Sequence, residues 1–302
     1  MGYDYTKEQL ADFRKAGEVT AKARAYGAEL ITVGARMEDV CDKIDAFIRD
    51  QGCELAFPSQ ISVNDCAAHY GAAYEDPFVF GEDHLAKLDL GAMVNGAVGD
   101  TAISVDLSTN KRYAKLIEAA HQALMNAIAI VKAGVKTSEI GREIERTVGK
   151  YGFTPVMNLS GHGIGINDLH GYPSIPNYDT KDEIVLKEGM TIAIEPFVTD
   201  GAGFVVERGE SELFMLEGKK PVRSPITRNA LKVIQRFKGF PFARRYVDRE
   251  LGKARVNFAL RELNNLGILH SFPPLLDKKG GIVAQAEHSI LVTKDGCEIL
   301  TK

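Results

Sequence analysis

Residues 87–101, KLDLGAMVNGAVGDT, decide the fold because this stretch predicts a two-stranded β-hairpin. Asn95-Gly96 between two apolar runs is the strongest short hairpin signal, since both central positions of the favoured turn need a positive φ. Counting outward from this turn places Asp89 and Asp100 on one face of the hairpin. They are diagonal neighbours, with Cβ atoms roughly 7 Å apart.

The two aspartates predict a positively charged partner. In this register Gly91 lies directly opposite Asp100, which leaves space between the carboxylates for one or two metal ions. Two carboxylates on an apolar, half-buried face repel each other and are costly to desolvate unless they are protonated or neutralised by a cation. The alternative is an exposed hairpin whose aspartates are solvated at the edge of a sheet.

Length and composition indicate an ordinary globular protein. The chain has 302 residues, of which 45% are apolar, enough for one large or two medium domains. No apolar run approaches the ~20 residues of a membrane span, and the first ten residues lack the apolar core of a signal peptide. The four cysteines form no CxxC pair and suit a reducing compartment. We therefore expect a cytoplasmic protein with no membrane partner.

The chain contains an internal repeat at an offset of 100 residues. Helices predicted over about 7–27 and 37–51 recur at about 110–132 and 137–151. The second helix of each pair carries the same apolar stripe, Val40, Ile44 and Ile48 in one and Ile140, Ile144 and Val148 in the other. Two helix-helix-strand units predict an α+β fold with a curved antiparallel sheet backed by helices, and any shared site on the inner face of that sheet.

Three side chains in the second half are further candidates for that site. His162 lies between two glycines, where the backbone can approach a bound ion, although a structural histidine is the alternative. Alternation in 189–196, GMTIAIEP, directs Glu195 inward at the end of a strand. Glu287 lies at the centre of a second alternating run, 284–292, AQAEHSILV, where a buried glutamate needs a partner.

Together these residues predict a site for two metal ions. Four carboxylates carry about four negative charges, which two divalent cations would balance. Oxygen-rich ligands with a single imidazole suit Co, Mn, Fe or Zn. Two such ions about 3.5–4 Å apart can share a bridging water, lower its pKa and promote a hydrolysis.

The order Asp89, Asp100, His162, Glu195, Glu287 resembles the five metal ligands of the pita-bread metallopeptidases, which include methionine aminopeptidases and prolidases. The resemblance covers nearly the whole chain, through LAFPSQISVNDCAAHY, KLDLG, GDTA, LSGHGIG, LHGYP, AIEPF and AQAEHSILV. The two glutamates are 92 residues apart. The segment between them, with PFARRY, LGIL and FPPLLDKKGGIVAQAEH, is similar to the insertion of type II methionine aminopeptidases in their archaeal form. The resemblance implies a pita-bread catalytic domain over 1–204 and 285–302, with an inserted helical subdomain over 205–284.

The resemblance also implies a role for each ligand. Asp89 would chelate one metal, and Asp100 and Glu287 would bridge both. His162 would bind the other metal. Glu195 would be a ligand that also takes a proton from the nucleophilic water.

Further residues match the substrate site of this family. His69 in CAAHY and His170 in LHGYP match two active-site histidines that are not ligands and that contact the scissile amide and the developing oxyanion. A satisfied core histidine is the alternative for His69. Phe57, Leu169 and Phe272 match the apolar walls of the methionine pocket. Some relatives place a histidine near Leu213, and this chain has none there.

The function implied is co-translational removal of the N-terminal methionine from nascent proteins with a small second residue, by a monomeric enzyme. One alternative is a proline-directed peptidase of the same fold, which usually adds a large N-terminal domain that has no room before residue 5. Another is a non-catalytic pita-bread binding protein, although such relatives have lost ligands and all five are present here.

The predicted insertion is strongly basic. Between Lys219 and Arg261 there are 13 Lys and Arg residues against two acidic residues, Asp248 and Glu250. A solvated helix face is one explanation for this excess of positive charge. Contact with ribosomal RNA near the exit of nascent chains is the other.

Overall fold

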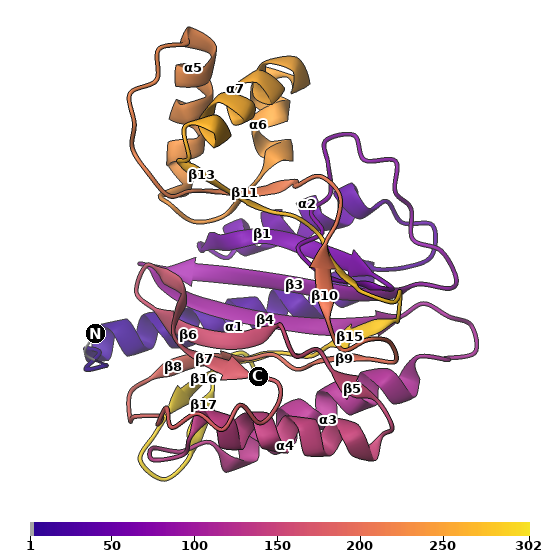
Figure 1. Ribbon diagram of the computed structural model, residues 1–302. Helices are drawn as coiled ribbons and strands as arrows, with labels where there is room; N and C mark the ends of the chain where they lie inside the picture. The colour runs from indigo at the N-terminus through magenta and orange to yellow at the C-terminus, as the bar shows by residue number, and fades with distance from the viewer. Residues whose placement is uncertain (1–2) are drawn as a thin grey trace.

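The computed structural model describes residues 3–302 (Figure 1). The helices are α1 (Lys7–Leu30), α2 (Met37–Asp50), α3 (Ala114–Ile130), α4 (Thr137–Lys150), α5 (Pro225–Ile234), η1 (Gln235–Phe237, a 3-10 helix), α6 (Arg244–Leu251) and α7 (Lys253–Asn265). The strands of the first half are β1 (Glu54–Val63), β2 (Cys66–Ala68), β3 (Leu85–Val94) and β4 (Ala97–Asp106).

The remaining strands follow α4. They are β5 (Thr154–Pro155), β6 (Ser160–Gly165), β7 (Asp168–Pro176), β8 (Thr191–Ile194), β9 (Phe197–Thr199), β10 (Val205–Glu207), β11 (Leu213–Leu216), β12 (Phe242–Ala243), β13 (Leu269–Phe272), β14 (Leu275–Asp277), β15 (Val283–Gln285), β16 (His288–Val292) and β17 (Cys297–Ile299).

The strands form several antiparallel ladders. The first half contributes β1-β3-β4, and the second half contributes β17-β16-β8-β6-β7 and β15-β9-β5. Helices α1 and α2 contact the first of these sheets, whereas α3 and α4 pack together on the strands of the second half (Figure 1). Helices therefore cover the outer side of both halves and leave the inner strands free to carry a site.

The predicted repeat is confirmed. The span of α4 is that of α2 moved by 100 residues. The predicted apolar stripe is buried in both helices, with at most 3% of any of its side chains exposed. The glycines at the equivalent positions 34 and 134 both have a positive φ, at 86° and 93°. Each half therefore closes its own core under an equivalent helix pair.

The hairpin has the register that the sequence predicts. Asn95 and Gly96 form the turn with φ of 50° and 87°, and Gly91 pairs with Asp100. The space above Gly91 is different from our expectation. A Cβ atom there would lie 2.6 Å from Cε1 of Phe57, so the glycine makes room for an aromatic ring and not for an ion.

Helices α5, α6 and α7 form a separate cluster with the β12-β11-β13 sheet, at the top of Figure 1. Their apolar side chains make a core of their own, which includes Val233, Phe242, Val256 and Leu263. Within residues 3–302, none of the helices has the length and apolar character needed to span a membrane.

Candidate metal centre

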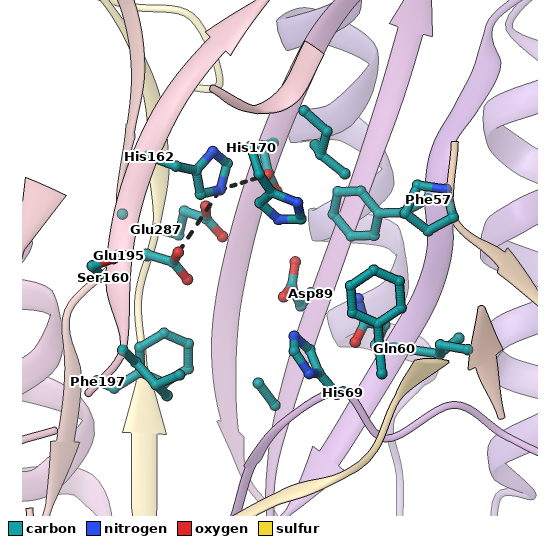
Figure 2. Close-up of a pocket in the computed structure, with 18 of the residues that line it drawn as sticks. Phe57, Gln60, His69, Asp89, Ser160, His162, His170, Glu195, Phe197 and Glu287 are labelled. Atoms are coloured by element: carbon teal, nitrogen blue, oxygen red, sulfur yellow. Dashed lines mark ion pairs between the residues drawn. The ribbon is translucent and has the colours of Figure 1, made fainter. Parts of the chain in front are cut away.

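The five candidate ligands come from both halves of the fold and converge on one cavity of about 350 Å³ (Figure 2). Asp89 lies on β3 and Asp100 on β4, whereas His162 lies on β6. Glu195 and Glu287 complete the group. A cavity of this size suits a small ligand or an amino-acid side chain.

The two glutamates do not lie within strands, although alternation in the sequence predicts strands there. Glu195 lies in the break between β8 and β9, and Glu287 lies in the break between β15 and β16. The breaks are adjacent, because the Ala286 amide donates to the Pro196 carbonyl at 3.3 Å. Interrupted pairing turns both carboxylates toward the cavity.

Hydrogen bonds of side-chain hydroxyl groups join β4 to the segment that carries Glu287. Ser289 Oγ donates to the Asp100 carbonyl and accepts from the Asp100 amide, both at 2.8 Å. Thr101 Oγ donates to the carbonyl of Glu287 at 2.7 Å. These buried bonds join the first half to the second and fix the backbone of both acidic residues.

Three of the candidate ligands are close enough to one another to share an ion. One side-chain atom each of Asp100, His162 and Glu287 lie within 4.8 Å of one another. Nε2 of His162 is 3.6 Å from Oδ2 of Asp100 and 3.8 Å from Oε1 of Glu195, as the dashed lines of Figure 2 mark. Asp89 also lines the cavity (Figure 2).

His162 is in a tautomer that could bind a metal ion. Its Nδ1 lies 3.2 Å from the carbonyl oxygen of Gly163. Since a carbonyl can only accept, Nδ1 carries the proton and Nε2 presents its lone pair to the carboxylates. Burial, followed by the nearby His170, lowers the pKa of His162 to about 3, so the imidazole is neutral.

The carboxylates are destabilised as anions in the absence of a cation. Burial raises the pKa of Asp89 to about 7. Burial and the charge of Asp89 raise the pKa of Asp100 well above its ordinary value, and burial and neighbouring carboxylates do the same for Glu195 and Glu287. Within residues 3–302, the buried Oδ1 atoms of Asp89 and Asp100 have no hydrogen-bond partner. A divalent cation would satisfy both the charge and these oxygens, so the residues fit a metal.

His69 also faces the cavity, from the other side of Asp89 (Figure 2). Its φ of 63° is in the left-handed region, which is uncommon for a residue other than glycine and costs about 1–3 kcal/mol. Its ring meets Phe272 edge-on, with centroids 5.4 Å apart. Burial, followed by the nearby His170, lowers the pKa of His69 to about 4. A strained, neutral imidazole therefore lies beside the candidate ligands and is not part of the group that could hold an ion.

The rest of the wall contains the other expected residues. His170 stands edge-on to His162, with ring centroids 4.6 Å apart, and is exposed. Phe57, Leu169 and Phe272 line the cavity. Leu213 lies in the lining as well, 2% exposed.

Two glutamines of the site lie within the motifs quoted above but are not among the predicted site residues. Gln285 Nε2 lies 3.4 Å from Oε2 of Glu195, and its donation also lowers the pKa of Asp89, although burial outweighs it. Gln60 lines the cavity and pairs in register with Asp89. The alternation that places Gln285 on the face of Glu287 is a signal in the sequence, whereas nothing local marks Gln60.

Comparison with known proteins gives one consistent family. Residues 11–294 match Metallopeptidase family M24. The chain is 39% identical over 300 residues to a methionine aminopeptidase of Archaeoglobus fulgidus, covering 99% of each chain. The solved structure of a methionine aminopeptidase from Thermotoga maritima superposes with a TM-score of 0.73 at 26% identity, covering 99% of this chain and 98% of that one.

A thermophilic Arx1 shares the fold, with a TM-score of 0.84 at 17% identity over 98% of this chain and 91% of that one. These similarities confirm the α+β pita-bread class expected from the repeat and the motifs. The family also explains why buried carboxylates without a counter-charge converge on one cavity. With a family match that spans most of its length, the chain belongs to metallopeptidase family M24.

Proposed function

We propose that the protein is a type II methionine aminopeptidase, which hydrolyses the bond after an N-terminal methionine when the second residue is small. One observation carries this proposal. The buried group of four carboxylates and one neutral imidazole opens onto a cavity lined by Phe57, Leu169 and Phe272. An apolar pocket next to a charged centre suits an unbranched thioether side chain whose backbone amide lies at the charged end.

In this proposal Asp89, Asp100, His162, Glu195 and Glu287 hold two divalent ions, drawn from Co, Mn, Fe or Zn. Bound ions of this kind supply an acidified water and stabilise charge on a reacting carbonyl. Asp100 and Glu287, whose segments are joined by the hydroxyl bonds of Thr101 and Ser289, would each contribute a carboxylate to both ions.

The remaining chemistry belongs to side chains around the cavity. Glu195 accepts a proton from the attacking water, since its carboxylate lies in the wall beside His162. His69 and His170 donate hydrogen bonds to the scissile amide and to the oxygen on which negative charge develops. Both imidazoles lie outside the ligand cluster, so they are free to contact substrate.

We further propose that 1–204 and 285–302 form the catalytic domain and that 205–284 form an inserted subdomain. The separate core of α5, α6 and α7 supports this division. The substrates are N-termini of nascent polypeptides in the cytoplasm, and the working form is a monomer.

We also propose that the insertion contacts the ribosome. Fewer of its basic side chains are available for this contact than the count of Lys and Arg suggests. Of the 13 basic residues between Lys219 and Arg261, six form ion pairs within the protein, namely Arg236, Lys238, Arg244, Arg245, Arg249 and Lys253. Arg228 and Lys232 on α5 are exposed and supply charge for an RNA backbone.

Peptide hydrolysis tests the proposed activity. Protein reloaded with Co or Mn is given Met-Ala, Met-Lys, Leu-Ala and Ala-Pro peptides, with a chelated sample as control. We expect release of methionine from Met-Ala, little from Met-Lys, and none without metal. Cleavage of Leu-Ala equal to that of Met-Ala would contradict the specificity, and preference for Ala-Pro would identify a proline-directed peptidase.

A further inference from the structure

Strand β1 contains a bulge at the wall of the cavity. Phe57 pairs with Gly91 and Gln60 pairs with Asp89, so the bulged strand has one more residue in this interval than β3. Phe57, Pro58 and Gln60 all line the cavity. Because a bulge redirects the side chains around it, its conformation sets the shape of this wall.

A side chain from α2 holds the bulge. The backbone N–H of Ser59, which has no partner in the β1–β3 register, donates to Oδ1 of Asp45 at 3.1 Å. Both residues are buried, Ser59 at 0% and Asp45 at 1% exposure. Pro58 has no N–H to offer, so the Ser59 bond is the anchor of this segment.

The other oxygen of Asp45 belongs to a buried ion pair with the α6 helix. Nη2 of Arg245 lies 2.7 Å from Oδ2 of Asp45, and the Tyr246 hydroxyl donates to the same oxygen. Nε of Arg245 also lies 3.2 Å from Oδ1 of Asp42. Arg245 is completely buried, which is uncommon for arginine and requires these partners.

We infer that Asp45 is a positioning residue for the substrate-side-chain pocket, and that Arg245 of α6 supplies the counter-charge that allows the Asp45 carboxylate to be buried. The linkage runs from Asp45 to the Ser59 amide, and from there to the wall formed by Phe57 and Gln60. Neither Arg245 nor Asp45 lines the cavity. The identity of the recognised side chain as methionine rests on the proposed function.

Two other ion pairs between the same two parts of the protein differ in kind. Lys238 lies 2.7 Å from Glu54, with 62% and 54% of the two side chains exposed. Lys253 lies 3.0 Å from Glu75, again with both side chains largely exposed. Exposed pairs contribute little to stability, and neither of these bonds to the bulge. Lys238→Met is therefore a matched control that removes one contact between the two parts.

Two double variants distinguish the effect of the hydrogen bond from the Ser59 amide from the effect of the ion-pair charges. D45N/R245Q removes the ion pair but keeps an amide oxygen that can accept from Ser59. D45L/R245M makes the same change in charge and removes the acceptor. A third variant, Ser59→Pro, removes the N–H without touching the ion pair, and it serves if D45L/R245M does not fold.

The readouts are the ratio of kcat/KM for Met-Ala over Leu-Ala, hydrogen exchange of residues 57–61, and metal content. We expect this ratio to fall by at least about tenfold in D45L/R245M and in Ser59→Pro, because a displaced wall discriminates poorly between similar side chains. Exchange at 57–61 should be faster in D45L/R245M, and metal content should be unchanged. D45N/R245Q and Lys238→Met should stay within about twofold of the wild-type ratio.

An unchanged ratio and unchanged exchange in D45L/R245M would overturn the inference, as would an unchanged ratio in Ser59→Pro. Equal losses in D45N/R245Q and D45L/R245M would also overturn it, because charge and not the anchor would then be responsible. Failure of the proposed function looks different. Wild-type protein would then not cleave Met-Ala, while exchange at residues 57–61 would still report on the anchor.

Discussion

Nε2 of His162 lies 3.6 Å from Oδ2 of Asp100, and the two residues belong to different halves of a duplicated fold. Neither half contains the complete group of candidate ligands. The first half supplies two aspartates from the hairpin, and the second supplies the imidazole and both glutamates. The site therefore forms only when the two halves pack together. The hydrogen bonds of the Ser289 hydroxyl with Asp100 and of the Thr101 hydroxyl with the Glu287 carbonyl stabilise this packing.

Removing the charge of Asp100 should empty part of the metal site. Asp100→Asn keeps the size of the side chain but lacks the second anionic oxygen needed to bridge two ions. We expect loss of activity and of at least one bound metal, measured by elemental analysis after reloading. Asp295→Asn, at an exposed position, is the control. Full activity with two metals in Asp100→Asn would remove this residue from the site.

Removing the imidazole of His69 should slow the reaction without loss of metal. Loss of one well-placed donor typically lowers kcat by ~10²–10³. Because φ at this position is 63°, His69→Ala also strains the backbone, whereas His69→Asn tolerates the conformation. We expect both variants to be slow and fully loaded with metal, and His69→Asn to have the higher Tm. Loss of a metal in His69→Asn would make His69 a ligand.

The stability of metal-free protein should respond to Asp89→Asn in a pH-dependent way. Burial raises the pKa of Asp89 to about 7, so ionisation favours the unfolded chain as pH rises from about 4 to about 7. Asparagine does not ionise, so metal-free Asp89→Asn should be the more stable protein at pH 7.5, by up to about 4 kcal/mol.

This advantage should vanish near pH 4, and with metal bound the order should reverse because wild type keeps its ligand. Urea unfolding at several pH values measures both effects. A constant difference between the two metal-free proteins from pH 4 to pH 8 would show that Asp89 is not a buried acid with a raised pKa.

Ribosome binding, if it uses the basic insertion, should depend on Arg228 and Lys232. Neutralising both with Arg236 should abolish salt-sensitive co-sedimentation with ribosomes, because phosphate contacts release counterions. Arg236 already pairs with Glu250 at 2.8 Å, so the first two residues should account for most of the effect. Neutralising the exposed Lys132 and Lys150 is the control. Unchanged co-sedimentation of the triple variant would show that these basic residues do not bind the ribosome.

The sequence predicted features whose signals are local or repeated. The Asn95-Gly96 turn determined the register of the hairpin, and the repeat identified two equivalent helix pairs. The breaks at Glu195 and Glu287 were missed because alternation of side chains continues through them. The contact of Arg245 with Asp45 joins residues 200 positions apart, and no pattern within either segment reports such a contact.

A titration of metal-free protein with Co or Mn, following bound metal and hydrolysis of Met-Ala in the same samples, tests whether the five buried side chains hold catalytic metal. We predict no activity without metal, and activity that rises as up to two ions bind per chain. We also predict that Asp100→Asn binds at least one ion fewer. Full activity in chelated, metal-free protein would contradict a metal-dependent reaction.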